Sequence, residues 1–199
     1  MRGTVFIFAK AARAGAVKTR LAADIGAGRA CALFRILTER TVFEVSRGPW
    51  RTIVAIDDGA GLRGWENIFP GALERRLQGG GDLGARMARA FAHAPPGPAI
   101  IVGADAPGLR TRHIRSAFKA LHGADAVFGP AADGGYWLIG LARRRPAPAL
   151  FDGVRWSTKF ALADTQKTLP PALKTVMLDR LTDIDEARDL VHLGPRSTR

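Results

Sequence analysis

The sequence predicts a single α/β domain built on a mostly parallel sheet with helices on both faces. Short apolar runs rich in β-branched residues recur along the chain, and Gly, Pro or Asp bounds each of them. Longer segments between several of these runs carry apolar residues at helical spacing. Strands that alternate with helices typically form a parallel sheet, and near-continuous hydrophobicity suits strands buried on both faces.

The strand candidates form a strong and a weak group. The strong runs cover residues 4–9, 52–56, 99–104 and 136–142. The weak runs cover residues 73–78, 125–129 and 174–179. Ligands of such sheets bind beyond the carboxyl ends of the strands, so we look for function in the loops that follow the strands.

Three segments show the apolar spacing of helices, namely residues 29–47, 82–93 and 111–122. We expect Asp82 and Thr111 to cap two of them, because short polar side chains at a helix start accept backbone N–H bonds. Ser157 precedes another helical segment and is also predicted to be an N-cap. Cys31 lies in the apolar pattern of the first helix, which predicts a buried small side chain rather than a nucleophile.

Length and composition favour one domain. A chain of 199 residues with 47% hydrophobic content can bury one substantial core. We expect this domain to cover residues 1–193 and a frayed tail to cover residues 194–199. The single cysteine allows no intrachain disulfide, and the first apolar run is too short to span a bilayer. We therefore expect a cytoplasmic protein without membrane insertion.

The charge balance predicts an anionic partner. Lys and Arg number 30 against 18 Asp and Glu, so the surface attracts phosphates, nucleic acid or anionic lipid. A general bias of the chain toward Arg, Ala and Gly is an equally good reading of the excess. The four histidines form no HExxH motif and no GxSxG motif is present, which argues against a zinc hydrolase or a serine hydrolase.

The loop after the first strand is the first candidate site. It places four cations around Gly15 ahead of a helix, namely Lys10, Arg13, Lys18 and Arg20. Cations, a flexible turn and free amides at a helix start make a polyphosphate cradle. The loop is not a Walker A motif, because Val17 stands where a glycine is needed. A solvated basic loop is the alternative.

Two further loops carry polar groups suited to a ligand. In the glycine-rich segment 78–87, the Gln78 amide could read a base edge, while Asp82 is at least as well explained as a helix cap. Asp105 follows the strongest strand on a turn shaped by Gly and Pro, which makes it the best metal ligand, because Mg²⁺ favours one or two carboxylates with phosphate oxygens and water. A turn or capping aspartate is the alternative for Asp105.

Other carboxylates and aromatics are less distinctive. Asp133 precedes two glycines, which let a backbone approach a ligand closely, and it could supply a second carboxylate near Asp105. Tyr136 and Trp137 follow on a strand, and core packing is the default for both. The pair Asp183 and Asp185 leads into a helix, and on these grounds alone capping is favoured.

Six segments taken together resemble the signature of the DUF2064 family. They are FAKAARAGAVKTRLA, QGGGDLGARM, GADAPGL, GPAADGGYWLIGL, LFDGVRWST and DIDEARDL, and they extend over nearly the whole chain. That family belongs to the glycosyltransferase-A-like, nucleotide-diphospho-sugar transferase superfamily. The resemblance implies a three-layer α/β/α Rossmann-like domain with a mixed sheet of about seven strands.

The resemblance also implies a nucleotide site and a metal site. The nucleotide site carries over to Lys10, Gly15, Lys18 and Arg20, and to these we add Ala9, Thr19, Gln78, Gly79 and Asp82 as further candidate positions. A divalent metal, Mg²⁺ or Mn²⁺, would be held by Asp105, with Asp133 and Asp185 as candidate partners. The family usually has prolines where this chain has Ala12 or Ala16, and a serine where it has Ala104, but neither change removes charge from the site.

We therefore expect a metal-dependent transferase that moves a glycosyl or related group from a nucleotide-diphospho-sugar donor to an unknown acceptor. Lys18 would offset charge on the leaving diphosphate, and Asp133 is the candidate base. One alternative is a nucleotidyltransferase, resembling guanylyltransferases that act on phospholactate, with a nucleoside triphosphate and a small phosphorylated substrate. Others are a basic nucleic-acid-binding protein, which is disfavoured because no nucleic-acid motif is recognised, and a non-catalytic nucleotide sensor.

Overall fold

A mixed sheet forms the centre of the computed structural model, which describes residues 3–10, 12–57, 73–144, 150–181 and 189. Within this part of the chain the sheet has seven strands in the order β3-β2-β1-β4-β6-β5-β7. The strands are β1 (Thr4–Ala9), β2 (Arg51–Ile56), β3 (Glu74–Leu77), β4 (Ala99–Gly103), β5 (Ala126–Pro130), β6 (Tyr136–Leu141) and β7 (Thr175–Met177). Only β6 is antiparallel to its neighbours among these strands.

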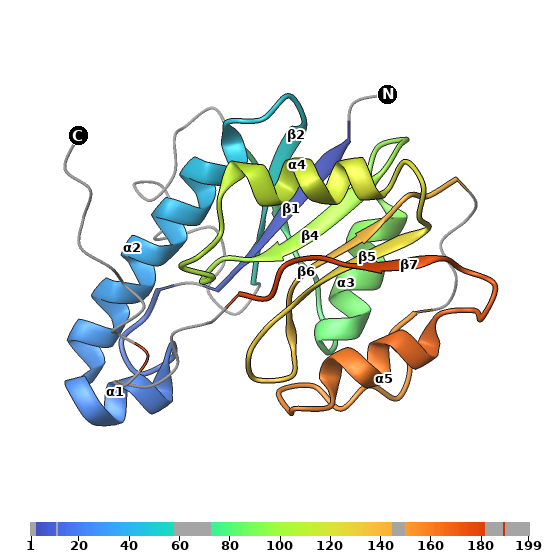
Figure 1. Cartoon of the computed structure of the whole chain (residues 1–199). Coiled ribbons are helices and arrows are strands. Elements are labelled where there is room, and N and C mark those ends of the chain that lie inside the picture. The colour runs from blue at the N-terminus through green and yellow to red at the C-terminus, as the bar shows by residue number, and fades with distance from the viewer. Residues whose placement is uncertain (1–2, 11, 58–72, 145–149, 182–188, 190–199) are drawn as a thin grey trace.

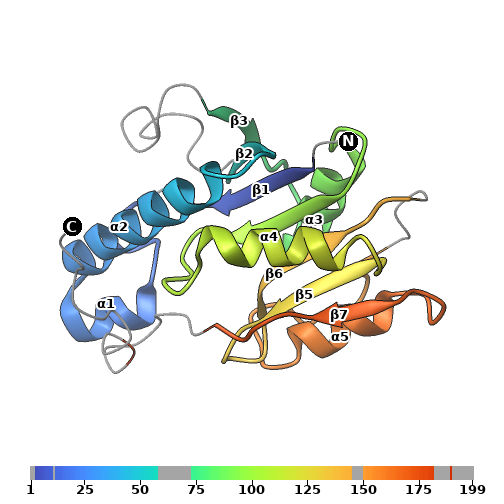
Figure 2. The same cartoon turned by 45° about the horizontal axis from the view of Figure 1, so that its top comes forward.

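Helices cover both faces of the sheet. Those described are α1 (Thr19–Ile25), α2 (Ala27–Ser46), α3 (Leu83–Ala92), α4 (Thr111–Ala120) and α5 (Ala161–Thr168). The long α2 and α4 lie on one face, and α3 and α5 lie on the other (Figures 1 and 2). The chain therefore has the three-layer α/β/α architecture that the sequence predicts.

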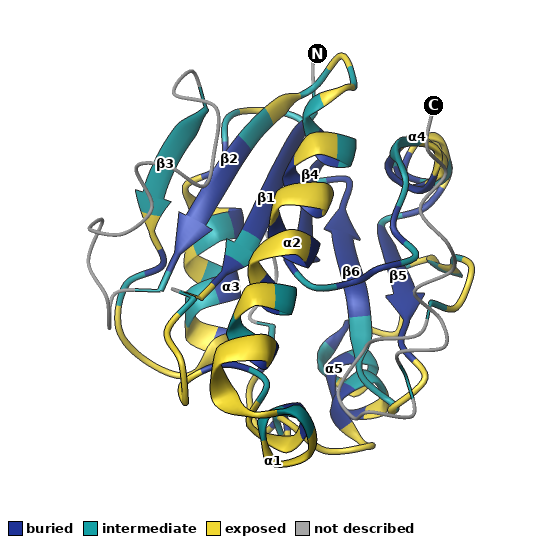
Figure 3. Cartoon of the chain, turned by 90° about the vertical axis from the view of Figure 1, so that its left-hand side faces the viewer, coloured by how far each residue is buried: buried dark blue, intermediate teal, exposed yellow. Residues whose placement is uncertain are grey.

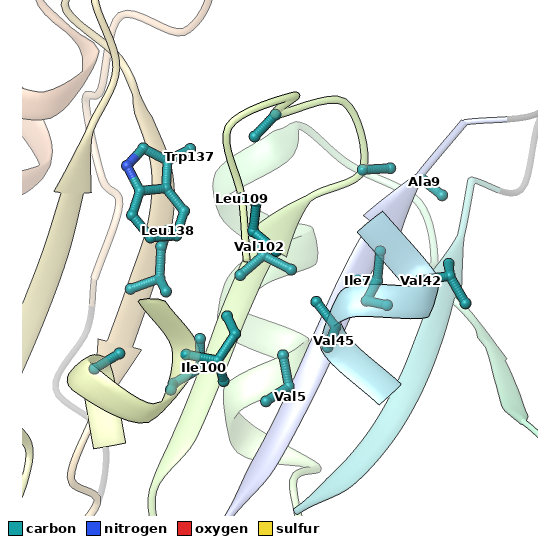
Figure 4. Close-up of a cluster of buried hydrophobic side chains, with 14 of the residues drawn as sticks. Val5, Ile7, Ala9, Val42, Val45, Ile100, Val102, Leu109, Trp137 and Leu138 are labelled. Atoms are coloured by element: carbon teal, nitrogen blue, oxygen red, sulfur yellow. The ribbon is translucent and has the colours of Figure 1, made fainter. Parts of the chain in front are cut away.

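Two hydrophobic clusters, one on each face, hold these layers together. Along β1, Val5 and Ile7 pack with Val42 and Val45 of α2 in one cluster (Figure 4). Phe6, between them in sequence, belongs to the other cluster, which includes side chains of α3. Because successive residues of a strand point to opposite faces, a continuous apolar run such as β1 serves both clusters.

All seven apolar runs are strands, and the three predicted helices are present, with ends that differ by a few residues. Asp82 caps α3 as predicted, since its Oδ1 accepts the Ala85 N–H at 2.8 Å. The prediction for Thr111 is wrong. Arg110 occupies the N-cap position of α4, and the Thr111 N–H donates instead to a Glu44 carboxylate oxygen of α2 at 2.9 Å.

Two further predictions of local structure need correction. Ser157 is not an N-cap, because α5 begins only at Ala161 and Phe160 occupies its N-cap position. Thr158 forms the turn before this helix, its hydroxyl accepting the Phe160 N–H at 3.2 Å. Cys31 is half-buried rather than buried. The expected tail 194–199, with Asp183 and Asp185, lies outside the described residues.

The reversed direction of β6 decides what meets at the carboxyl edge of the sheet. The parallel strands β1 and β4 end at this edge, and each is followed there by a loop. Because β6 is antiparallel to β4, it begins at the edge where β4 ends. The loop that precedes β6 is therefore brought beside the loops that follow β1 and β4.

Candidate active site

The loop after β1 is a turn that returns the chain to the sheet edge. The Ala16 N–H donates to the Arg13 carbonyl at 3.0 Å, and Gly15 between them has a φ of 81°, which favours glycine. Val17 is 4% exposed and anchors the end of the loop in the protein. Gly15 thus shapes the turn that delivers Lys18 to the start of α1.

Lys18 and Asp105 form the central contact of the site. The Lys18 ammonium lies 2.6 Å from Asp105 Oδ2, and the Lys18 side chain is only 5% exposed whereas that of Asp105 is 36% exposed. The Lys18 backbone is left-handed, with a φ of 48°. A non-glycine residue in this region is under local strain that the surrounding structure must offset, a feature common at ligand sites.

Asp133 reaches the same edge from the loop before β6. Its Oδ1 accepts the Gly135 N–H at 2.8 Å, which holds the carboxylate in a tight turn. Gly134 has a φ of 88°, and a Cβ there would lie 2.3 Å from the Lys159 carbonyl oxygen. The turn that presents Asp133 therefore requires glycine at position 134.

These loops enclose a cleft of about 430 Å³ at the carboxyl edge of the sheet. Its polar lining includes Lys10, Lys18, Thr19, Arg20, Asp105, Asp133 and Ser157, and its apolar lining includes Phe8, Val17 and Phe34. The volume is within the range of about 300–1,000 Å³ typical of small-molecule sites. Cations and carboxylates on one cleft suit a ligand that carries phosphate together with a divalent cation.

Several residues predicted for the nucleotide site are not in the lining described for this cleft. Ala9 is buried, and its carbonyl accepts a hydrogen bond from the Gln78 amide at 3.3 Å. Gln78 is itself 6% exposed and also donates to the Ala55 carbonyl at 2.9 Å, so its N–H groups bind backbone rather than face a base. The Gln78 prediction of base reading is therefore not supported.

The glycine-rich segment that follows also forms contacts within the protein. Asp82 caps α3, and a Cβ at Gly79 would clash with the Arg89 guanidinium. Arg89 donates to the Gln78 carbonyl at 2.6 Å and to the Gly80 carbonyl at 3.0 Å. These contacts explain the segment as a turn held by α3.

The structure adds residues that sequence reasoning did not assign to the site. Phe34 of α2 lines the cleft, and nothing in the local sequence pointed to it. Ser157 also lines the cleft, and its backbone is left-handed, with a φ of 59°. The loop that carries Ser157 is held by two hydrogen bonds from Arg155 to Asp164, at 2.7 and 3.0 Å. Those bonds, with a smaller opposing effect of burial, lower the pKa of Asp164 to about 2.

The two carboxylates of the cleft can supply ligands to a metal ion but cannot fill its coordination shell alone. One carboxylate oxygen of Asp105 pairs with the Lys18 ammonium, and one of Asp133 accepts the Gly135 N–H. The second oxygen of each carboxylate could therefore contact a metal ion. Among the described residues no group of three His, Cys, Asp or Glu side chains is placed to hold an ion. The two carboxylates suit Mg²⁺ or Mn²⁺ only with oxygens from a bound phosphate or water.

A larger cavity, of about 1070 Å³, opens near the other edge of the sheet. Its lining includes Trp50 and Phe118, whose ring centroids are 5.4 Å apart, and the side chains of Arg115 and Lys119. Its described lining contains no carboxylate, and it lies before β1 and β4 rather than after them. The smaller cleft is therefore the better candidate for the chemistry.

A family model described as "Uncharacterized protein conserved in bacteria (DUF2064)" matches residues 41–158. The chain belongs to the DUF2064 family. The matched region includes Asp105 and Asp133 but begins after the loop of Lys18, so the case for that loop rests on the contact with Asp105. No curated protein matches the chain.

Solved structures share the fold of this DUF2064 chain. A protein of Desulfovibrio desulfuricans G20, provisionally named a nucleotide-diphospho-sugar transferase, is 24% identical with a TM-score of 0.85, and the match covers 100% of this chain and 90% of that one. A 4-diphosphocytidyl-2C-methyl-D-erythritol synthase of Anaerococcus prevotii is 12% identical with a TM-score of 0.61, covering 96% and 94%. These likenesses establish the nucleotide-diphospho-sugar transferase fold.

A third structure of this fold contains a metal. Rv0371c of Mycobacterium tuberculosis H37Rv, in complex with manganese, is 14% identical to the DUF2064 chain with a TM-score of 0.57. The match covers 97% of this chain and 98% of that one.

The helices of the DUF2064 chain were also compared with the requirements of a membrane span. Within the described ranges, none of them combines the length and the apolar character needed to traverse a bilayer.

Proposed function

We propose that this protein is a metal-dependent transferase that binds a nucleotide-diphospho-sugar or related nucleotide and transfers the glycosyl or related group to an acceptor. The observation that carries the proposal is the 2.6 Å contact between Lys18 and Asp105, two residues that are far apart in sequence and meet in one cleft. Its setting at the carboxyl edge of the sheet supports a nucleotide site. We assign the reaction to the cytoplasm and to one domain over residues 1–193.

The diphosphate of the donor would lie among the cations of the cleft. Lys10 and Lys18 line it from the loop after β1, and Thr19 and Arg20 line it from the first turn of α1. Their charge would offset the negative charge that develops on the leaving diphosphate, an effect worth several kcal/mol when the groups are already in place. Gly15 acts by shaping the loop.

Asp105, with Asp133 and Asp185 as further ligands, would hold a divalent metal that supplies additional positive charge at the diphosphate. Asp133 would also be placed to accept the proton of an acceptor hydroxyl. The hydroxyl oxygen then bonds to the transferred carbon as the bond from that carbon to the diphosphate oxygen breaks. The products are the glycosylated acceptor and a nucleoside diphosphate.

A ligand screen tests the proposal. The melting temperature of the protein is measured with nucleoside mono-, di- and triphosphates and with nucleotide-diphospho-sugars, each with and without Mg²⁺ or Mn²⁺. We expect selective stabilisation by a diphosphate-containing ligand with metal, because a ligand at 100 times its Kd stabilises the native state by about 2.7 kcal/mol. No stabilisation by any of these ligands would contradict the proposal.

A nucleotidyltransferase is the second candidate, and the fold shared with the Anaerococcus prevotii synthase supports it. The same cations and carboxylates would then act on the α-phosphate of a nucleoside triphosphate. The products separate the two reactions. Release of pyrophosphate from a triphosphate supports nucleotidyl transfer, whereas release of a nucleoside diphosphate from a sugar donor supports glycosyl transfer.

A further inference from the structure

The outward side of α2 carries a straight stripe of three arginines and three apolar residues. The members of this stripe recur every three or four residues and are all exposed: Arg29, Ala32, Ile36, Arg40, Phe43 and Arg47. Residues at this spacing lie on one side of a helix, and the stripe is about 27 Å long. Figure 3 shows the exposed band along α2.

The apolar members of the stripe are unusually accessible. Phe43 is 61% exposed and Ile36 is 50% exposed, the first and equal-second highest values among the large hydrophobic residues described as exposed. They lie seven residues apart, two turns along the same side of the helix. Burial against a partner surface would remove this apolar area from water.

The charge around the stripe has one dominant sign. None of its members is acidic, and Arg35 and Glu39 are the exposed charged residues beside it on α2. Helix α4, on the same face of the sheet, adds exposed Arg112, Arg115 and Lys119 (Figure 1). The partner of this face should therefore be negatively charged.

We propose that the α2 stripe docks on an anionic lipid surface. The aliphatic side chain of Ile36 and the ring of Phe43 would enter the boundary between headgroups and acyl chains. The arginines would keep their guanidinium groups at the lipid phosphates. This is attachment to a surface and does not require a membrane-spanning helix.

Other partners fit the stripe less well. The Arg47 guanidinium already lies 5.2 Å from the centre of the Phe43 ring, so one face of that ring is covered and base stacking is hindered. The aliphatic Ile36 has no corresponding use on a nucleic acid. In a pair of α2 helices packed stripe to stripe, the arginines of both copies would gather at a desolvated interface to which the stripe itself brings no carboxylate.

Vesicle flotation tests the proposal on the full chain. Vesicles of phosphatidylcholine alone are compared with vesicles that also contain phosphatidylserine, over a salt series. Two variants change the stripe: R29Q/R40Q removes charge, and F43S removes the exposed ring. The matched control is K159Q/K174Q, which removes the same charge from exposed residues near α5 and β7.

We expect salt-sensitive binding only to the vesicles that contain phosphatidylserine, weakened about fivefold for each arginine removed. F43S should weaken binding severalfold, and the control should leave it nearly unchanged. Melting curves confirm that each variant is folded. The proposal fails if these vesicles do not bind, if the control weakens binding as much as R29Q/R40Q, or if F43S has no effect.

A nucleic acid gives a distinct result in the same assay. If single-stranded oligonucleotides bind more tightly than the vesicles and F43S does not change that binding, the stripe is a nucleic-acid surface and the lipid proposal is overturned. Weak oligonucleotide binding that does not displace the vesicles supports the lipid surface. The test does not involve the cleft, so its outcome is separate from that of the proposed reaction.

Discussion

Lys18 is the central residue of the candidate site. A lysine ammonium that is largely removed from water needs an anionic partner, and Asp105 provides one at 2.6 Å. In the ligand-free protein Lys18 therefore neutralises the carboxylate that we assign to the metal. A metal and the ammonium compete for Asp105 until a bound phosphate offers Lys18 another anion.

This competition predicts opposite effects of one substitution. Lys18→Met removes the ammonium and keeps an unbranched side chain, so Mn²⁺ should bind the nucleotide-free protein severalfold more tightly. The same variant should bind a nucleoside diphosphate about 10- to 100-fold more weakly, because it lacks a charge-assisted hydrogen bond. Electron paramagnetic resonance of free Mn²⁺ measures the first effect and calorimetry the second.

Lys119→Met, on the exposed side of α4, is a matched control for these measurements. It should change neither affinity. If Lys18→Met also leaves both affinities unchanged, Lys18 neither competes with the metal nor contacts the phosphate.

Gln78 shows why a single side chain is hard to interpret from sequence. Its amide can donate to a nucleobase or to backbone with equal ease, and the pattern around it does not distinguish the two. In the structure the amide bridges the carbonyls of Ala9 and Ala55 at the ends of β1 and β2. That use depends on strand pairing between segments far apart in the chain, which local sequence does not reveal.

At the scale of elements, the start of α4 depends on contacts from another helix and from its own first turn. The Glu44 carboxylate of α2 accepts from the Thr111 N–H at 2.9 Å, and His113 Nδ1 accepts from the Arg110 N–H at 3.0 Å. Burial would raise the pKa of Glu44, but the hydrogen bonds from Thr111 lower it overall. Burial, assisted by the nearby charge of Arg112, lowers the pKa of His113.

The lowered pKa of His113 predicts acid sensitivity of this helix start. As pH falls through about 6.5, the unfolded chain binds a proton at this position before the folded protein does, so stability decreases. Protonation also removes the Nδ1 lone pair that accepts the Arg110 N–H. In His113→Gln, the fall in melting temperature between about pH 8 and about pH 5 should be roughly 2–4 °C smaller than in the wild type.

His122→Gln is the control, because His122 is exposed at the end of the same helix. It should reproduce the pH profile of the wild type. A profile of His113→Gln that is equally steep would show that His113 does not contribute to acid sensitivity.

The elements themselves could be predicted well, and their caps less well. Continuous hydrophobicity predicts strands such as β1 and β4, because burial on both faces excludes polar side chains. The N-cap predictions succeeded at Asp82, whose partner Ala85 is three residues away. They failed at Thr111, whose partner Glu44 is 67 residues away in sequence.

At the scale of the whole molecule, the topology assembles the cleft. The edges of a parallel sheet collect loops that follow strands, which is why Lys18 and Asp105 could be predicted to converge. Asp133 precedes β6, and it joins them because β6 runs antiparallel to β4. Hydrophobic patterning predicts that β6 exists but not its direction, so Asp133 could be proposed for the site only through the family resemblance and its neighbouring glycines.

The net charge of the molecule predicts the sign of its partner's charge but not where the partner binds. A formal net charge of +12 predicts an anionic partner without saying where it binds. Among the described residues, one group of cations lines the cleft beyond β1 and another lies on the outward side of α2. We expect the first to bind phosphate beside a metal and the second to meet lipid phosphates.

The central claim is that the loop after β1 and Asp105 act on the same bound diphosphate, and calorimetry of nucleoside diphosphate binding with and without Mn²⁺ tests it most directly. The wild type is compared with Asp105→Asn and with Asp152→Asn, which changes an exposed carboxylate outside the described cleft lining. We predict that Mn²⁺ tightens binding to the wild type and to Asp152→Asn but not to Asp105→Asn. Equal tightening in all three proteins would contradict the account.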